Sequence, residues 1–169
     1  IEVMVTVFIL TVGLLGMAGL QSRLQQSEME AYQRSQALLL LNDMANRLAT
    51  NRNVAASYVT STTGIGAGTC PTTTGTQLQR DMKEWCEALQ GAAETSGGSK
   101  VGAMIGGRGC VEALPSNAYM VTVAWQGQVP LTAPPASVAC GANSYDGGPG
   151  CSADRCRRAV TTIVKVATL

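Results

Sequence analysis

The sequence predicts an α+β fold, in which a long N-terminal α-helix, its apolar half protruding, packs on a small antiparallel β-sheet. Three observations predict it. The chain begins with an apolar run that continues into a polar segment of helical spacing, short alternating segments follow, and six cysteines are spread over the later part. A length of 169 residues suits one long helix and one modest globular domain.

The apolar run, residues 1–22, has the length of a membrane span. Residues 3–20 rise about 27 Å as a helix, close to the ~30 Å hydrocarbon core of a bilayer. The basic leader and small-residue cleavage site of a secretory signal are not recognisable, so we expect the segment to be retained. Its one charged side chain is Glu2. A charge at the centre of a span costs about 2.5–3.5 kcal/mol, so we expect Glu2 to have a cationic partner.

The helix is expected to continue to residue 54, because no proline interrupts residues 1–54. An apolar stripe recurs at helical spacing through Leu24, Ala31, Leu38, Leu41, Ala45 and Leu48. The opposite side carries charges of both signs and is expected to face solvent: Arg23, Glu28, Glu30, Arg34, Asp43, Arg47 and Arg52. Residues 37–41 are five consecutive apolar residues, too broad a set for one packing face.

Three glycines, Gly13, Gly16 and Gly19, interrupt the apolar half of the helix. Glycine in a helix interior costs roughly 1 kcal/mol relative to alanine. Two interpretations stay open. The glycines either form a small-residue face that lets another helix approach closely, or mark a point where the helix unwinds locally.

Residues 55–169 are expected to form the globular head. A short helix is predicted at 78–90 by its apolar spacing, with Gly91 at its end. Its acidic residues Asp81, Glu84 and Glu87 are expected on a solvated face. Alternating segments predict strands at 101–105, 110–114, 119–126 and 160–167. The Pro- and Gly-rich stretch 129–156 predicts a disulfide-braced surface loop in the C-terminal region.

The six cysteines, all beyond the apolar run, predict a disulfide framework and an oxidising compartment: Cys70, Cys86, Cys110, Cys140, Cys151 and Cys156. Six cysteines allow about fifteen pairings, and spacing does not choose among them. Zinc is disfavoured because the closest pair, Cys151 and Cys156, is too widely spaced and the chain has no histidine.

The absence of histidine also removes the usual general base and the usual activator of a nucleophile. No phosphate-binding or dinucleotide-binding glycine motif is present in its required context. A net charge of +1 provides no basic patch for nucleic acid. We therefore expect no enzymatic activity, no catalytic residue, no cofactor, no metal and no nucleic-acid partner.

Taken together, several segments resemble type IV pilin-like proteins. IEVMVTVFILTVGLLGMAGLQ resembles the N-terminal methylation segment of pilins, in which an apolar stretch carries one Glu near its start. LLLNDMANRLATNRNVAASYV, DMKEWCEAL and YMVTVAWQG resemble the PilV minor-pilin family, the type IV pilus modification proteins. The resemblance covers residues 1–90 and 110–127, whereas the loop 129–156 has no counterpart in it.

The resemblance implies a structural subunit of a type IV pilus, a minor pilin acting in assembly, priming or at the tip. Glu2 matches the acid at the fifth mature pilin position, so about three residues are expected upstream. The implied partners are other major and minor pilins through the helix, the inner membrane before assembly, a prepilin peptidase and a tip adhesin. The implied location is the inner membrane with the head in the periplasm, and later the extracellular filament.

Physical reasoning suggests a partner for Glu2 in such a filament. A carboxylate buried among bundled helices must meet a cation, and we expect this to be the α-amino terminus of a neighbouring subunit. Gly13, Gly16 and Gly19 would then permit close packing. Our best guess pairs Cys70 with Cys86 and leaves the other cysteines unassigned. The alternatives are a major pilin, a type II secretion pseudopilin, or a monomeric membrane-anchored periplasmic binding domain.

Overall fold

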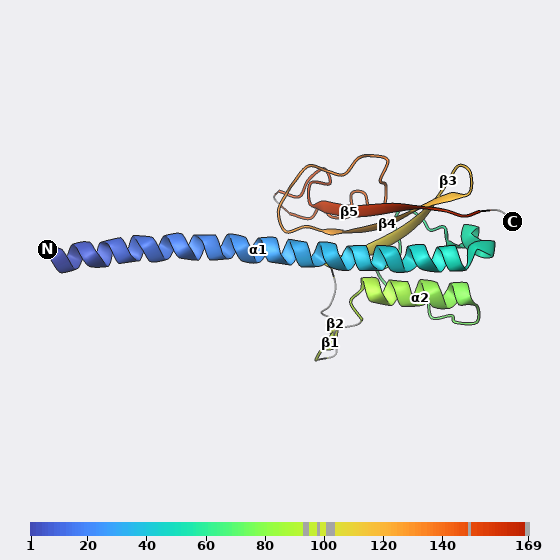
Figure 1. The fold of residues 1–169 in the computed structure, drawn as a ribbon, viewed down its shortest axis with the longest axis horizontal. Coiled ribbons are helices and arrows are strands. Elements are labelled where there is room, and N and C mark those ends of the chain that lie inside the picture. The colour runs from blue at the N-terminus through green and yellow to red at the C-terminus, as the bar shows by residue number, and fades with distance from the viewer. Residues whose placement is uncertain (93–94, 98, 101–103, 149, 168–169) are drawn as a thin grey trace. The chain divides into compact units, whose positions relative to one another are not determined.

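The computed structural model describes residues 1–92, 95–97, 99–100, 104–148 and 150–167. The described elements, in chain order, are helix α1 (Glu2–Thr50), the 3-10 helix η1 (Arg52–Tyr58), helix α2 (Gln77–Leu89) and strands β1 (Thr95–Ser96), β2 (Ser99–Lys100), β3 (Arg108–Leu114), β4 (Ala118–Gln126) and β5 (Arg157–Lys165) (Figure 1). The chain divides into two compact units, Ile1–Tyr32 and Gln33–Leu169. Each unit is described by itself below.

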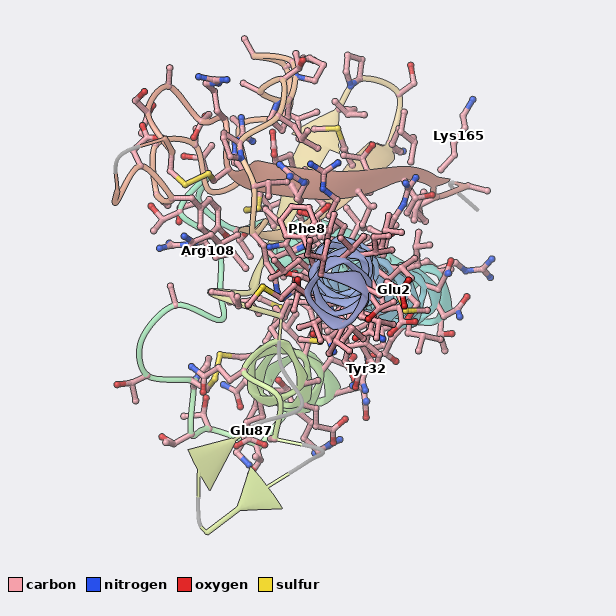
Figure 2. The ribbon with its side chains drawn as sticks, turned by 90° about the vertical axis from the view of Figure 1, so that its left-hand side faces the viewer. Glu2, Phe8, Tyr32, Glu87, Arg108 and Lys165 are labelled. Atoms are coloured by element: carbon pink, nitrogen blue, oxygen red, sulfur yellow. A yellow bond between two sulfur atoms is a disulfide. The ribbon has the colours of Figure 1, made fainter. Side chains whose placement is uncertain are left out.

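The first unit, Ile1–Tyr32, is helical from Glu2 onward. Every side chain from Ile1 to Met29 is exposed. Viewed along the helix, the side chains point outward in all directions, with Glu2 and Phe8 on different sides (Figure 2). Helix α1 is long and apolar enough to cross a membrane, a property that signal sequences share.

The second unit, Gln33–Leu169, is built around one hydrophobic core. Helix α1 contributes buried residues at intervals of three and four, the spacing of one helical face: Ala37, Leu41, Met44 and Leu48. They pack with Tyr58 of η1, Trp85 and Leu89 of α2, and the inner side chains of the sheet, Val111, Val121, Val123 and Trp125. A long helix and a small antiparallel sheet are thus present, as the α+β prediction requires.

The buried face of α1 differs from the expected stripe. Leu41 and Leu48 are buried as expected, but Leu24, Ala31 and Leu38 are exposed. The buried set instead includes Ala37 and Met44, which lie one position before Leu38 and Ala45. Since neighbouring residues point about 100° apart on a helix, the packing face extends from Leu41 and Leu48 toward Ala37 and Met44 and away from Leu38.

Strands β3, β4 and β5 form an antiparallel sheet in that order. Val111 pairs with Val121, which pairs in turn with Thr162. A tight turn joins β3 to β4 through Ser116 and Asn117, both at positive φ. The strands expected at 110–114, 119–126 and 160–167 are therefore present with shifted limits. Of the strand expected at 101–105, residues 101–103 lie outside the described residues, and Met104 and Ile105 are not in a strand.

Helix α2 closes one side of the core and is delimited by local signals. Thr76 caps its start through a capping box, in which the Gln79 amide donates to the Thr76 hydroxyl at 3.2 Å and the Gln79 side chain accepts from the Thr76 amide at 3.2 Å. The helix ends at Leu89, and Gly91 takes a positive φ of 74° just beyond it. These limits agree with the prediction of 78–90 to within one residue.

Helix α1 ends at Thr50, four residues before the expected end at residue 54. Val54 has non-helical backbone angles, and the chain turns into η1 instead. The turn carries Tyr58 into the core, where its side chain is fully buried. The Asn51 side chain donates a hydrogen bond to the Tyr58 hydroxyl at 2.9 Å. Burial of one aromatic ring therefore sets the end of the helix.

Candidate functional site

The surface of the first unit is the first candidate site, because its apolar side chains have no cover within the unit. Glu2 is exposed, and no cation of the described residues forms a salt bridge with it. Gly13, Gly16 and Gly19 lie in an unbroken stretch of α1. A Cβ at any of the three positions would meet nothing within 4 Å. The surface next to them is open to an approaching helix.

A second apolar surface lies on α1 within the head unit. Of the five consecutive apolar residues 37–41, Ala37 and Leu41 face the core, and Leu40 is partly buried. Leu38 and Leu39 are 42% and 62% exposed. The head thus covers one face of this segment and leaves two leucines on another.

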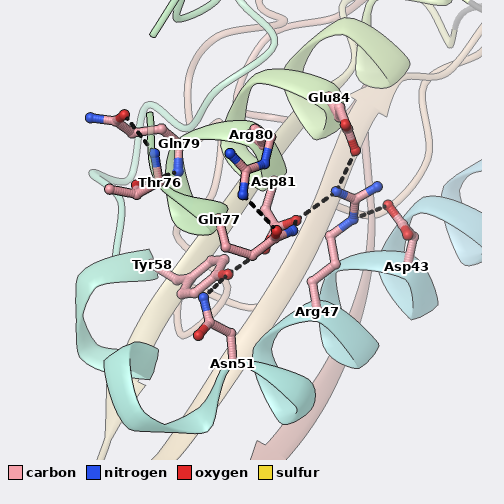
Figure 3. A network of polar contacts seen from close by, with 10 residues as sticks. All are labelled: Asp43, Arg47, Asn51, Tyr58, Thr76, Gln77, Gln79, Arg80, Asp81 and Glu84. Atoms are coloured by element: carbon pink, nitrogen blue, oxygen red, sulfur yellow. Dashed lines mark hydrogen bonds and ion pairs between the residues drawn. The ribbon is translucent and has the colours of Figure 1, made fainter. Parts of the chain in front are cut away.

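The main polar network of the head joins α1 to α2 around Arg47 (Figure 3). Its guanidinium contacts three carboxylates: Asp43 at 2.9 Å on α1, and Asp81 at 2.9 Å and Glu84 at 2.7 Å on α2. Burial lowers the pKa of Arg47, but the hydrogen bonds that its guanidinium donates to Glu84, Asp43 and Asp81 outweigh this effect, so the pKa is raised and the cation is held. The arrangement fastens the two helices together.

Asp81 is the centre of this network and is only 3% exposed. Besides Arg47, it accepts hydrogen bonds from the Gln77 side chain at 2.8 Å and from the Tyr58 hydroxyl. Burial, with the hydrogen bond to Asp81, raises the pKa of Tyr58 to about 12. The Tyr58 phenol and the Gln77 amide therefore complete the hydrogen bonds of the buried Asp81 carboxylate. This arrangement is structural and supplies no nucleophile.

The expectation that Asp81 faces solvent is wrong, whereas Arg47 is partly exposed. Asp81 lies three residues after Leu78 and four before Trp85, so it belongs to the apolar face of α2. Its place on the apolar face is therefore a signal in the sequence that predicts the burial of Asp81. The spacing of four between Asp43 and Arg47 likewise indicated an ion pair. Glu84, whose side chain is 57% exposed, lies nearer the expected solvated face.

All six cysteines form disulfides, so the expected framework is present. One bond joins Cys70 to Cys86 on α2, the pair guessed from the sequence, and the others join Cys110 to Cys140 and Cys151 to Cys156. The Cys110–Cys140 bond fixes the loop between β4 and β5 to strand β3. It lies in a small second core with Ala124 and Tyr145.

Further contacts brace the loop between β4 and β5. The Tyr145 hydroxyl donates to the Gly106 carbonyl at 2.8 Å, and the Arg108 guanidinium lies 5.7 Å from the centre of its ring. Burial raises the pKa of Tyr145 to about 12. The buried Arg157 pairs with Asp154 at 3.1 Å and donates to the carbonyls of Val138 and Cys140. The loop is therefore a fixed part of the head.

Within the described part of the chain, no group of three or more His, Cys, Asp or Glu side chains is arranged to hold a metal ion. Two hollows of the surface are lined by both polar and apolar groups. One, of about 310 Å³, is lined by Arg52, Asn53, Asn117, Tyr119 and Val166, among others. A second, of about 240 Å³, opens onto the Arg47 network. Neither brings a nucleophile next to a general base.

Comparison with known proteins identifies no relative: no family model, curated protein or solved structure matches the chain.

Proposed function

We propose that the protein is a structural subunit of a type IV pilus or a related filament, acting as a minor pilin in assembly, priming or at the tip. The observation that carries the proposal is the first unit, whose apolar side chains from Val3 to Leu20 are exposed on every side. A helix that is apolar all round requires a membrane or neighbouring helices around it. A pilin satisfies both requirements in turn, first in the bilayer and then in the filament core.

Leu38 and Leu39 favour a filament over a monomeric anchored domain. A monomer needs one apolar face on this part of α1, and the head already covers it through Ala37 and Leu41. The two exposed leucines add a second face, which helices of neighbouring subunits would bury. Burial of one leucine side chain stabilises an interface by about 1.5–3 kcal/mol.

Glu2 is the proposed docking group. In a bundle that excludes water, its carboxylate requires a cation, and the proposed cation is the α-amino group of a neighbouring subunit. The open surface at Gly13, Gly16 and Gly19 lets that neighbour come close. The pair would set the axial register between subunits.

The test compares Glu2→Ala with Glu28→Ala, which removes an exposed acid from the same helix, in cells that produce the protein. Both variants are quantified in the membrane fraction and in filaments sheared from the cell surface. We expect both in the membrane, and only Glu2→Ala to be largely lost from filaments. Equal recovery of the two variants in sheared filaments would contradict the docking role.

A second pair of variants addresses the monomeric alternative. Leu39→Lys places a charge on the second apolar face, whereas Asn42→Lys places one at an exposed polar position of the same helix. A filament subunit is expected to lose incorporation with Leu39→Lys only. A monomeric anchored domain tolerates both and is absent from sheared filaments in every form.

A further inference from the structure

The two outer edges of the sheet differ, because the chain itself closes one of them. On β3, Gly109 exchanges two backbone hydrogen bonds with Ile65, at 2.9 and 2.8 Å. Two residues along, the Val111 carbonyl accepts from the Thr60 amide at 2.9 Å, and the Val111 amide donates to the Thr60 hydroxyl at 3.0 Å. Segment 60–65 thus occupies the β3 edge.

The β5 edge is open. In an antiparallel pair, alternate residues point their backbone groups at the partner strand. Just beyond the ends of the β4–β5 ladder, the Val166 amide donates to the Asn117 carbonyl and the Gly127 amide donates to the Cys156 carbonyl. Because the register between them is continuous, the even-numbered residues of β5 are the ones hydrogen-bonded to β4. The odd-numbered residues point their N–H and C=O groups outward: Ala159, Thr161, Ile163 and Lys165. Among the residues that the structure describes, no backbone hydrogen bond reaches these groups.

The exposed side chains along this edge are β-branched at its centre, Thr161 and Ile163, and cationic at one end, Lys165. Ile163 is 64% exposed, and Thr161 and Lys165 are exposed beside it. The Lys165 side chain points away from the sheet (Figure 2). At the other end, Arg158 is on the opposite face of the strand from Lys165, and its guanidinium donates to the Val129 and Arg155 carbonyls. Arg157 is buried and paired with Asp154, and β5 contains no acidic residue.

We propose that the β5 edge binds an extended segment of another protein, which adds a strand to the sheet. The segment has β-branched residues at its centre, against Thr161 and Ile163, and an acidic side chain at the end that lies beside Lys165. Main-chain hydrogen bonds supply affinity in such strand addition, and the flanking charge selects the partner. This inference does not depend on the pilus proposal.

Charge argues against a second copy of the chain as the occupant. Antiparallel pairing of two β5 strands provides no acidic side chain opposite Lys165 of either copy, since β5 contains none. Lysine on an edge strand is also a common means by which proteins prevent pairing between their own copies.

The test uses the full chain, labelled with ¹⁵N in detergent micelles, and the peptide acetyl-Glu-Thr-Val-Thr-Val-Thr-Glu-amide. Residue-resolved hydrogen exchange is measured with and without the peptide. We expect the amides of Thr161 and Ile163 to exchange at least about tenfold more slowly with the peptide, and those of Thr162 and Val164 to be unchanged. Absence of binding, or protection located elsewhere, overturns the proposal. The proposal is also overturned if, without the peptide, the Thr161 and Ile163 amides become more protected from exchange as the protein concentration rises. The occupant of the edge is then a second copy.

Two variants sharpen the test. Lys165→Glu should weaken binding of the acidic peptide about fivefold, whereas Arg34→Glu, the same charge change on α1, should leave it unchanged. Ile163→Pro removes one outward N–H without touching the ladder to β4 and should abolish binding, while Ile163→Thr keeps the N–H and should retain binding. If Ile163→Pro does not fold, Lys165→Glu decides: unchanged affinity in that variant overturns the charge selection.

Discussion

The indole of Trp85 lies so close to Gly109 that a Cβ at position 109 would stand 2.3 Å from the Cη2 atom of Trp85. This contact packs α2 against β3 at the centre of the core. It also explains why strand β3 carries a glycine there, since any larger residue would displace the indole, whose Nε1 donates to the Leu40 carbonyl at 2.9 Å. One glycine thus allows a single tryptophan to contact both the sheet and α1.

Gly109→Ala should therefore destabilise the head by about 1–3 kcal/mol, the usual cost of overpacking a core. The free energy of unfolding is measured by denaturant titration of the full chain in micelles, followed by the fluorescence of Trp85 and Trp125. Gly147→Ala is the matched control, because a Cβ there meets nothing within 4 Å. Equal stability of the two variants would show that the indole has room to move.

Arg47→Met should cost about 3 kcal/mol, because it leaves the buried Asp81 without its cation. This is the lower end of the range for breaking a buried pair, since Arg47 is 23% exposed. Glu84→Gln removes another carboxylate from the same guanidinium at the surface and should cost about 0–1 kcal/mol. The same denaturant titration compares them, and a larger loss in Glu84→Gln would contradict the central role assigned to Asp81.

Alkaline pH should destabilise the head through Tyr58. Its pKa is about 12 in the folded chain against an ordinary value of 10.0, so the folded state keeps a proton that the unfolded state releases. The stabilisation is complete below pH 10 and is lost as the pH rises toward 12. Tyr145, with a pKa of about 12, acts in the same window and the same direction.

The measurement is the free energy of unfolding at several pH values between 8 and 11. Tyr58→Phe should flatten the fall in stability above pH 10, and Tyr145→Phe should do so as well. Tyr32→Phe, which changes an exposed tyrosine of α1, should leave the pH profile as it is. A profile in Tyr58→Phe identical to that of the unmodified chain would refute the linkage.

The disulfides should differ in their contribution to stability, because they close loops of different length. The Cys110–Cys140 bond spans 30 residues and the Cys151–Cys156 bond spans 5. The loop-entropy relation gives about 3.6 kcal/mol for the longer loop and about 2 kcal/mol for the shorter. Paired Cys→Ala replacements, compared by denaturant titration, test this order. A larger loss of stability on removing Cys151–Cys156 than on removing Cys110–Cys140 would contradict the loop-entropy argument. The contacts of Tyr145 and Arg157 would then suffice to hold the loop between β4 and β5.

Local signals account for the elements that the sequence predicted well. Apolar spacing and the turn chemistry at Gly91 located α2 to within one residue, and alternation located β3, β4 and β5. The apolar run, residues 1–22, lies within the first unit, which extends to Tyr32. Each of these signals is contained within one segment of the chain, so neither a partner element nor a contact at a distance is needed to interpret it.

Features that depend on contacts between distant segments were missed. The end of α1 at Thr50 depends on the burial of Tyr58, and the burial of Asp81 depends on Arg47, 34 residues earlier in the chain. Closure of the β3 edge by Ile65 requires the close approach of Gly64, where a Cβ would stand 2.7 Å from the Gly109 carbonyl oxygen. Glu2 forms no salt bridge within the described residues, so its docking role stays a prediction.

The distribution of buried residues along α1 determines how the head would respond to tension. Ala37, Leu41, Met44 and Leu48 lie within twelve residues, or about 16 Å of helix, and all contact the same core. A pull along the helix axis must slide these contacts past the sheet together and break the Arg47 ion pairs to α2 in the same movement. The load is therefore carried in shear by many contacts at once, a geometry that resists mechanical extraction far better than one in which contacts peel away singly.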